Sequence, residues 1–232
     1  MRHHSHRAAI VLAALLLASP LTAQSGHWKG SIQTPNGELD VEIDLAQDGD
    51  KGWIGSLSIP SQNAKGLGLL NVAVKEGSIS FALKAPGQPR FQGTIDKEGG
   101  KMTGQFIQSG TEMTFQLTRT GEAKVEKPVR NAALSKELEG TWEGTLDTPQ
   151  GSLRLRVVLS NEAGAGTGSL FSVDQGNTEL PIARITQKDA AVILEVPLID
   201  GGFRGELKGN EMAGEWSQRG NSLPLQLTKV VK

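Results

Sequence analysis

The chain has 232 residues, with 24 Lys and Arg against 25 Asp and Glu, so its formal net charge at pH 7 is −1. This near balance gives no reason to expect nucleic acid or an anionic membrane surface as a partner, since both need a basic patch. The chain has no cysteine, which excludes disulfide bonds and thiolate metal sites, so a hydrophobic core must stabilise the fold.

Residues 1–23 have the pattern of a secretory signal peptide. A polar start carries Arg2 and Arg7, an apolar run covers Ala8–Ala18, and the segment ends at Ala23, a small residue. The apolar run is shorter than the roughly 20 residues that cross a bilayer, and the lack of cysteine excludes a lipid anchor. We therefore expect export to the periplasm or the extracellular medium, with no membrane span in the mature chain.

The rest of the chain consists of two copies of one unit. Residues 24–120 and 140–232 contain matching segments in the same order and at nearly the same spacing, with residues 121–139 between them. Because order and spacing agree, we predict a duplication that gives two separately folded domains. The matched segments are Trp28–Leu39 with Trp142–Leu153, Gly55–Leu57 with Gly168–Leu170, Phe91–Ile95 with Phe203–Leu207, Met102–Gly110 with Met212–Gly220, and Gln116–Arg119 with Gln226–Lys229.

Hydrophobic and polar residues alternate within each copy. Leu39, Val41, Ile43 and Leu45 are separated by acidic residues, and Leu153–Leu159 repeats the pattern in copy two. Alternation with period two indicates strands that have one face on a core and the other in water. Similar short runs between glycine-rich turns predict about eight strands per copy. The expected fold is all-β, with two tandem small antiparallel barrels or sandwiches.

Residues 121–139 are predicted to be a linker. The first half is charged and has little to bury, which is typical of an extended connection. The second half, Ala132–Leu138, is compatible with one or two helical turns. We expect a protease to cut this segment first.

Each copy begins with a Gly-x-Trp-x-Gly motif and has a basic residue near its end. These residues are Gly26, Trp28, Gly30 and Arg119 in copy one, and Gly140, Trp142, Gly144 and Lys229 in copy two. The motif resembles the opening motif of lipocalins, in which the Trp plugs the closed end of an eight-stranded barrel and a basic residue covers it. A cation over an indole face is favourable. The chain has no tyrosine, so the second lipocalin motif is missing, and the short strands imply a small lumen filled by side chains.

Copy two carries a further pattern of glycine, aromatic and turn residues. It includes Gly168–Gly176 and Trp216 within Gly214–Gly220, whereas copy one has Phe106 at the position of Trp216. The pattern resembles the β-domain that precedes the catalytic domain in some secreted bacterial α/β-hydrolases and related serine hydrolases. The resemblance implies an accessory module of a separately encoded hydrolase, because this sequence holds no catalytic domain after it.

No motif indicates catalysis. His27 is the only histidine after the predicted signal peptide, and Gly-x-Ser-x-Gly and Ser-x-x-Lys motifs are absent. One histidine without cysteine excludes ordinary zinc sites. Asp44, Asp48 and Asp50 offer carboxylates for a calcium ion or for glycosidase chemistry, although a solvated strand and turn explain them equally. We predict a solvated His27, no catalytic residue, no metal and no cofactor.

The most polar stretch of copy two is the candidate binding loop. Ser172, Asp174 and Gln175 are interpreted either as contacts to a ligand or partner at the barrel mouth, or as groups that bond the local backbone of a turn. Gln218, together with Gln108 of copy one, is expected to satisfy backbone groups of that loop. Trp53, which has no tryptophan counterpart in copy two, is a further candidate contact.

Three functions follow from these patterns. The leading hypothesis is an exported, non-catalytic tandem barrel protein that binds a small ligand, a glycan or a partner protein. The alternative is the accessory module of a secreted serine hydrolase. An enzyme that uses carboxylates is the third.

Overall fold

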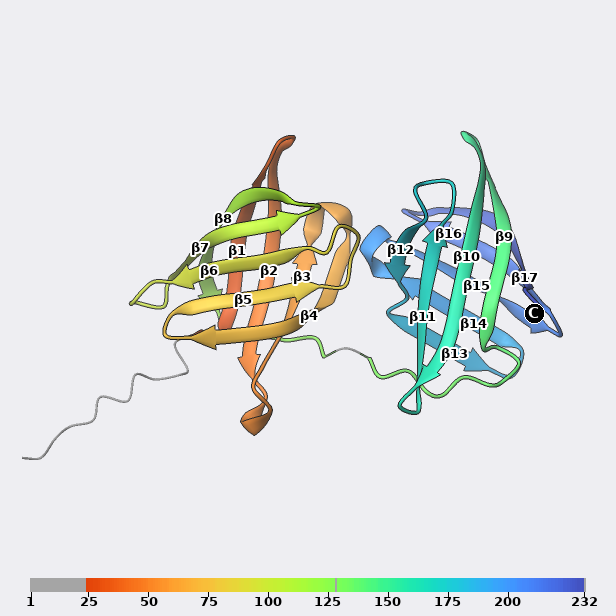
Figure 1. The fold of residues 1–232 in the computed structure, drawn as a ribbon, viewed down its shortest axis with the longest axis horizontal. Helices are drawn as coiled ribbons and strands as arrows, with labels where there is room; N and C mark the ends of the chain where they lie inside the picture. The colour runs from red at the N-terminus through yellow and green to blue at the C-terminus, as the bar shows by residue number, and fades with distance from the viewer. Residues whose placement is uncertain (1–23, 128, 232) are drawn as a thin grey trace, which may run out of the picture.

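The computed structural model describes residues 24–127 and 129–231, so the predicted signal peptide lies outside the described residues. Two β units lie side by side and are joined by one linker (Figure 1). The all-β, lipocalin-like prediction is confirmed: one unit is a closed antiparallel barrel, and the other is a curled sheet of nine strands. None of the described residues belongs to a helix long and apolar enough to cross a membrane.

The first unit is a closed barrel in which each strand pairs with the next and β1 also pairs with β8. Two short 3-10 turns, η2 (Gly49–Lys51) and η3 (Pro60–Gln62), interrupt the connections. The strands are β1 (Gly26–Thr34), β2 (Gly37–Gln47), β3 (Trp53–Ile59), β4 (Ala64–Lys75), β5 (Ser78–Leu83), β6 (Arg90–Ile95), β7 (Lys101–Gln108) and β8 (Thr111–Gly121).

The second unit repeats this meander with one difference. Its strands are β9 (Gly140–Thr148), β10 (Gly151–Glu162), β11 (Ala165–Ser172), β12 (Thr178–Pro181), β13 (Arg184–Lys188), β14 (Ala191–Val196), β15 (Gly201–Lys208), β16 (Glu211–Gln218) and β17 (Asn221–Lys229), with the 3-10 turn η4 at Pro197–Ile199. The sheet begins at β12 and ends at β13, and no ladder joins these two edges.

The additional strand arises because one long strand is split. In the first unit, β4 pairs with β3 through its first half and with β5 through its second half. In the second unit, the matching partners are separate: β12 pairs with β11, and β13 pairs with β14. Pro181 ends β12, and proline lacks the N–H that would continue a ladder. The second unit therefore has nine strands where the first has eight, in keeping with the prediction of about eight strands per copy.

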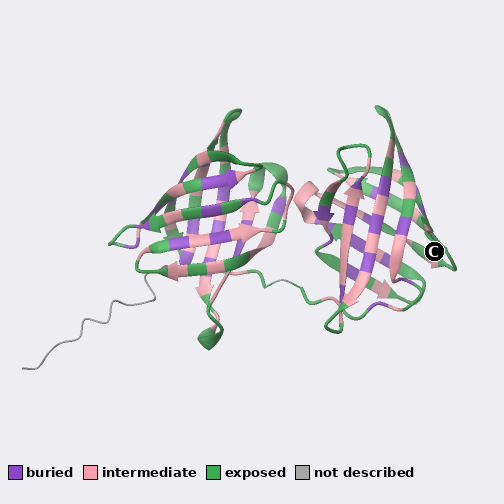
Figure 2. Cartoon of the chain, in the orientation of Figure 1, coloured by how far each residue is buried: buried purple, intermediate pink, exposed green. Residues whose placement is uncertain are grey.

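Each unit has its own hydrophobic core (Figure 2). The alternating residues Val41, Ile43 and Leu45 of β2 point inward and are buried, as are Leu155, Val157 and Leu159 of β10. The two clusters share no buried residue. This separation is what the duplication predicts for two domains.

The tryptophans of the Gly-x-Trp motifs lie inside the two units and are fully buried. Lys229 Nζ lies 5.2 Å from the centroid of the Trp142 ring and donates to the carbonyl of Glu137 at 2.7 Å. In the first unit, Arg119 Nε donates to the carbonyl of Ser25 at 3.0 Å. In each unit, the basic residue therefore lies at the end at which the tryptophan is buried. This is the arrangement that the lipocalin resemblance implies.

The glycines of the motif allow close approach. A Cβ at Gly26 would overlap the side chain of Arg119, and a Cβ at Gly140 would lie 2.9 Å from Lys229 Cε. At Gly30, a Cβ would overlap the carbonyl of Gln116 on β8; Gly144 has the same relation to Gln226 on β17. Glycine is required at these places because the neighbouring strand or cation occupies the side-chain position.

The linker packs along both units. In its first half, the backbone N–H of Lys124 donates to Asp44 Oδ1 at 2.7 Å, and Lys127 pairs with Asp48 at 3.0 Å. In its second half, Leu134 and Leu138 are buried in the second core. Residues 136–138 form a turn in place of the helical turns considered from the sequence. The second half of the linker is thus part of the second unit's core.

Candidate functional site

The predicted binding loop is a turn held by its own side chains. Asp174 accepts hydrogen bonds from the backbone N–H of Arg154 at 2.8 Å and from Arg154 Nε at 2.9 Å. Ser172 Oγ donates to Gln175 Oε1 at 2.8 Å. The hydrogen bonds from Arg154 and its charge lower the pKa of Asp174. These contacts favour the structural interpretation of the loop over the ligand-binding one.

Gln218 bonds elsewhere than expected. Its Nε2 donates to the carbonyl of Ile199 at 3.3 Å, and Gln108 Nε2 donates to the carbonyl of Pro86 at 2.9 Å. The carbonyl of Ile199 lies in the connection between β14 and β15, and that of Pro86 lies in the matching connection between β5 and β6. The expectation that these glutamines satisfy the Ser172 loop is therefore wrong. They hold the neighbouring connection at the mouth of each unit.

Trp53 is on the other unit from the candidate loop, so the structure does not unite the predicted residues in one site. Its side chain is partly buried and packs against the first core from the start of β3. Trp216 lies in the second core and is buried.

A cavity of about 270 Å³ occupies the mouth of the first barrel. Phe91 and Phe106 are at its lining, 4.8 Å apart between ring centroids. Ile32 lines it as well, whereas Trp28 closes the other end of β1, beside Arg119. The remaining lining from the barrel is apolar except for the side chains of Gln62 and Gln108.

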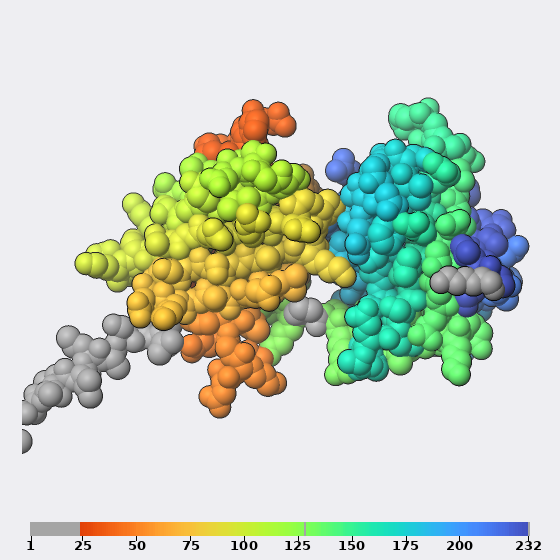
Figure 3. Space-filling view, viewed as in Figure 1, coloured from red at the N-terminus to blue at the C-terminus, as the bar shows by residue number. Residues whose placement is uncertain are grey.

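The second unit covers this mouth. Leu180 of β12 and Leu198 and Ile199 of η4 complete the cavity lining, and β4 contacts η4. The two units touch on this side in the space-filling view (Figure 3). The cavity is thus bordered by an apolar barrel interior on one side and by three aliphatic side chains of the second unit on the other.

A sequence difference between the copies marks the cavity. In the second unit, Trp216 stands where the first has Phe106, and both Trp216 and Ile199 lie against Gly201. The larger indole and η4 occupy the space at that mouth. The Phe-for-Trp exchange was visible in the sequence, but its consequence depends on how η4 packs, which the sequence alone does not reveal.

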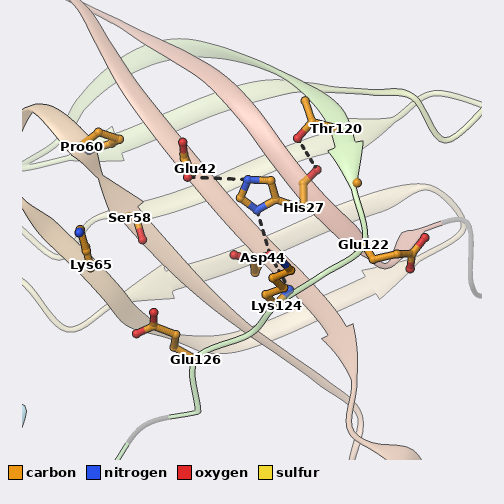
Figure 4. A pocket seen from close by; sticks show the side chains of 11 residues that line it. His27, Glu42, Asp44, Ser58, Pro60, Lys65, Thr120, Glu122, Lys124 and Glu126 are labelled. Carbon is orange, nitrogen blue, oxygen red and sulfur yellow. Dashed lines mark hydrogen bonds and ion pairs between the residues drawn. The ribbon is translucent and has the colours of Figure 1, made fainter.

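A second, polar depression lies on the outer face of the first barrel, beneath the linker (Figure 4). It measures about 680 Å³. His27 Nδ1 lies 2.9 Å from Asp44 Oδ1, and His27 Nε2 lies 3.7 Å from Glu42 Oε2. Its side chain is only 23% exposed, so the expectation of a freely solvated His27 is wrong. Its contacts help to hold Asp44, which in turn binds the backbone of Lys124.

The carboxylate of Asp48, one of the three aspartates considered for a calcium ion, is engaged by a lysine. Asp48 binds Lys127, whose hydrogen bond and charge lower the pKa of this carboxyl. Within residues 24–127 and 129–231, no three His, Cys, Asp or Glu side chains are placed to hold a metal ion.

Comparisons with known proteins do not identify a family. No protein-family model and no curated protein matches the chain. Among solved structures, the chain is similar to a DUF3598-family protein of unknown function from Nostoc punctiforme, with 16% identity and a TM-score of 0.26 over 90% of this chain and 97% of that one. It is also similar to the heme-binding protein PhuS from Pseudomonas aeruginosa, with 10% identity and a TM-score of 0.15 over 90% and 78%. These scores are too low to support a shared function.

Proposed function

We propose that the protein is an exported, non-catalytic binding protein that holds a small apolar ligand at the mouth of the first barrel, beneath the second unit. The observation that carries this proposal is the cavity of about 270 Å³ lined by Phe91, Phe106 and aliphatic side chains of both units. Ligand sites are concave and mostly apolar, with a few polar groups that fix orientation.

The lining sets the chemistry of the ligand. Gln62 and Gln108 are the polar side chains at the cavity, and the amide of Gln108 already donates to Pro86. Binding therefore depends on apolar area removed from water, at about 25 cal/mol per Å² before the costs of association. The volume lies slightly below the roughly 300–1,000 Å³ of drug-sized sites, so the ligand is small or has a thin chain.

The arrangement of His27 supports a non-catalytic function. Both ring nitrogens face carboxylates, Asp44 and Glu42, whereas nucleophilic catalysis needs a histidine that activates a serine. The polar depression that contains His27 lies on the outer face of the barrel and shares no lining residue with the cavity.

Calorimetric titration of residues 24–232 with octan-1-ol tests the proposal. Ala85 lines the cavity, so Ala85→Phe should fill it and abolish binding. Ala73, on exposed β4, provides the matched control Ala73→Phe, which should bind as the wild type does. Urea midpoints verify that both variants fold. Equal binding by folded Ala85→Phe and Ala73→Phe, or no binding by the wild type to octan-1-ol and shorter alkanols, would refute the cavity as the ligand site.

A further inference from the structure

The cavity adjoins a second hollow that lies between the two units. This groove measures about 390 Å³ and shares Leu67, Leu83, Ala85 and Leu198 with the cavity lining. The cavity and the groove therefore border each other along these four side chains.

The groove differs from the cavity in charge. Four cationic side chains line it against two carboxylates, those of Glu126 and Glu195. The cations are Lys65, Lys84, Lys127 and Arg184. The lining thus carries an excess of two positive charges, whereas the predicted mature chain as a whole is slightly acidic.

Two of these four cations have no ion-pair partner within residues 24–127 and 129–231. Lys127 pairs with Asp48 at 3.0 Å, and Arg184 Nε lies 3.6 Å from Glu195. Lys65 and Lys84 form no ion pair with any other residue in the described parts of the chain. Both lysines line the groove, and neither is neutralised by a carboxylate in the described parts of the chain.

The same groove also exposes apolar surface. Leu70 is 45% and Val129 48% exposed, and both line the groove. Large exposed aliphatic side chains beside a cavity are typical of a binding surface when they are contiguous with it. Among the described hollows that border the cavity, this groove has both Lys65 and Lys84 in its lining, whereas the hollow formed by Leu83–Gln88 and Thr178–Pro181 has Lys84 alone.

We propose that the ligand is an anionic amphiphile, with its aliphatic chain in the cavity and its charged head beside Lys65 and Lys84. This rests on the proposed function, because it takes the cavity as the ligand site. A carboxylate or phosphate head gains charge-assisted hydrogen bonds from the two ammonium groups. A cationic head would be repelled by the excess positive charge of the groove. A ligand with a neutral head would gain only the free energy of burying its aliphatic chain.

Calorimetry with ligands that share one chain and differ in the head tests this proposal. Decanoate, decyl phosphate, decan-1-ol and decyltrimethylammonium are titrated below micelle formation into residues 24–232. We expect both anions to bind at least about tenfold more tightly than the alcohol, and the cation to bind most weakly. The ratio between decanoate and decyl phosphate distinguishes a carboxylate from a phosphate as the preferred head.

The double variant Lys65→Gln/Lys84→Gln isolates the head site. It should weaken decanoate about tenfold and leave decan-1-ol within about twofold. Lys75→Gln/Lys97→Gln removes the same charge from lysines outside the groove and should leave both affinities unchanged. If the wild type binds decan-1-ol and decanoate equally, or if both double variants lose decanoate alike, the head site is overturned while the cavity stands. If no ligand of the series binds, the proposed function falls with it.

Discussion

The side chain of Asn131 accepts a hydrogen bond from the backbone N–H of Ile185 at 2.9 Å. The same amide donates to the carbonyl of Gly166 at 3.1 Å. Gly166 is on β11 and Ile185 is on β13, next to the edges that no strand ladder joins. Asn131 of the linker therefore bridges β11 and β13 at a seam that the first unit closes with the continuous strand β4.

Replacing Asn131 by Ala should destabilise the second unit by about 1–3 kcal/mol, because two partly buried backbone groups lose their partners. Urea unfolding of residues 130–232 measures the change. Asn221→Ala, at the exposed start of β17, is the matched control and should leave the midpoint unchanged. An unchanged midpoint for Asn131→Ala would show that water satisfies Ile185 and Gly166 equally well.

Separate expression of the two units should show where the second unit begins. Residues 24–127 and 130–232 should each fold, because each contains a complete core. Residues 140–232 should be much less stable than 130–232, because they lose Leu134 and Leu138, each contributing about 1.5–3 kcal/mol when buried.

Circular dichroism and urea midpoints of the three fragments test this expectation. Equal stability of 130–232 and 140–232 would mean that residues 130–139 contact the second unit without stabilising it. Loss of structure in 24–127 would mean instead that the first barrel depends on the second unit at its mouth.

The fold was predictable because its signals are local and repeated. Alternation in β2 and β10 decides which side chains face the core, and the Gly-x-Trp motif recurs in both copies. The split of one strand at Pro181 and the packing of Leu138 were not predicted. Pro181 was visible in the sequence, but the partners that the two half-strands take, and the burial of Leu138 in the second core, depend on contacts that a pattern of residue types does not specify.

The candidate site was less predictable for the same reason. A dense polar loop such as Ser172–Gln175 looks alike whether its groups face a ligand or each other, and here Arg154 engages Asp174. The cavity depends on Leu198 of the second unit lying at the mouth of the first, whose lining includes Phe106. Only the Phe-for-Trp difference between the copies was visible beforehand.

The ion pair between Arg154 and Asp174 should make the stability of the second unit depend on pH. Hydrogen bonds from Arg154, together with its positive charge, hold the pKa of Asp174 below the usual range of an aspartate. A lowered carboxyl pKa in the folded state contributes stability above the unfolded pKa, and that contribution is lost as pH falls through the folded pKa. The pair should therefore stabilise the unit at pH 7 and not in strong acid.

A double-mutant cycle with Arg154→Gln and Asp174→Asn measures the coupling from urea midpoints. We expect a favourable coupling at pH 7 that disappears in acid well below the ordinary carboxyl pKa of about 3.9. A coupling of the same size at both pH values would show that hydrogen bonding, and not the charge of Asp174, joins the two residues.

Trp142 should be the most costly single truncation in the second unit. Its indole is fully buried, its Nε1 donates to the carbonyl of Leu138 at 3.0 Å, and Lys229 covers its ring. Trp142→Ala should cost about 3–5 kcal/mol, a large part of the stability of a small domain. Trp142→Phe keeps an aromatic ring but loses the hydrogen bond, so its free energy of unfolding should lie between those of the wild type and Trp142→Ala.

Trp53→Ala provides the comparison in the first unit. Trp53 is only partly buried. Its counterpart in the second unit is Gly166, because Trp53 pairs with Gln47 in the first unit and Gly166 pairs with Asn161 at the matching place in the second. In the second unit, the side chain of Leu134 packs over Gly166. The linker therefore covers the part of the second core that corresponds to the part covered by the Trp53 indole in the first unit. Trp53→Ala should therefore cost less than Trp142→Ala, as measured by urea unfolding of 24–127 and 130–232. An unchanged midpoint for Trp142→Ala would mean that the indole does not close the barrel end, and the role assigned to the Gly-x-Trp motif would be wrong.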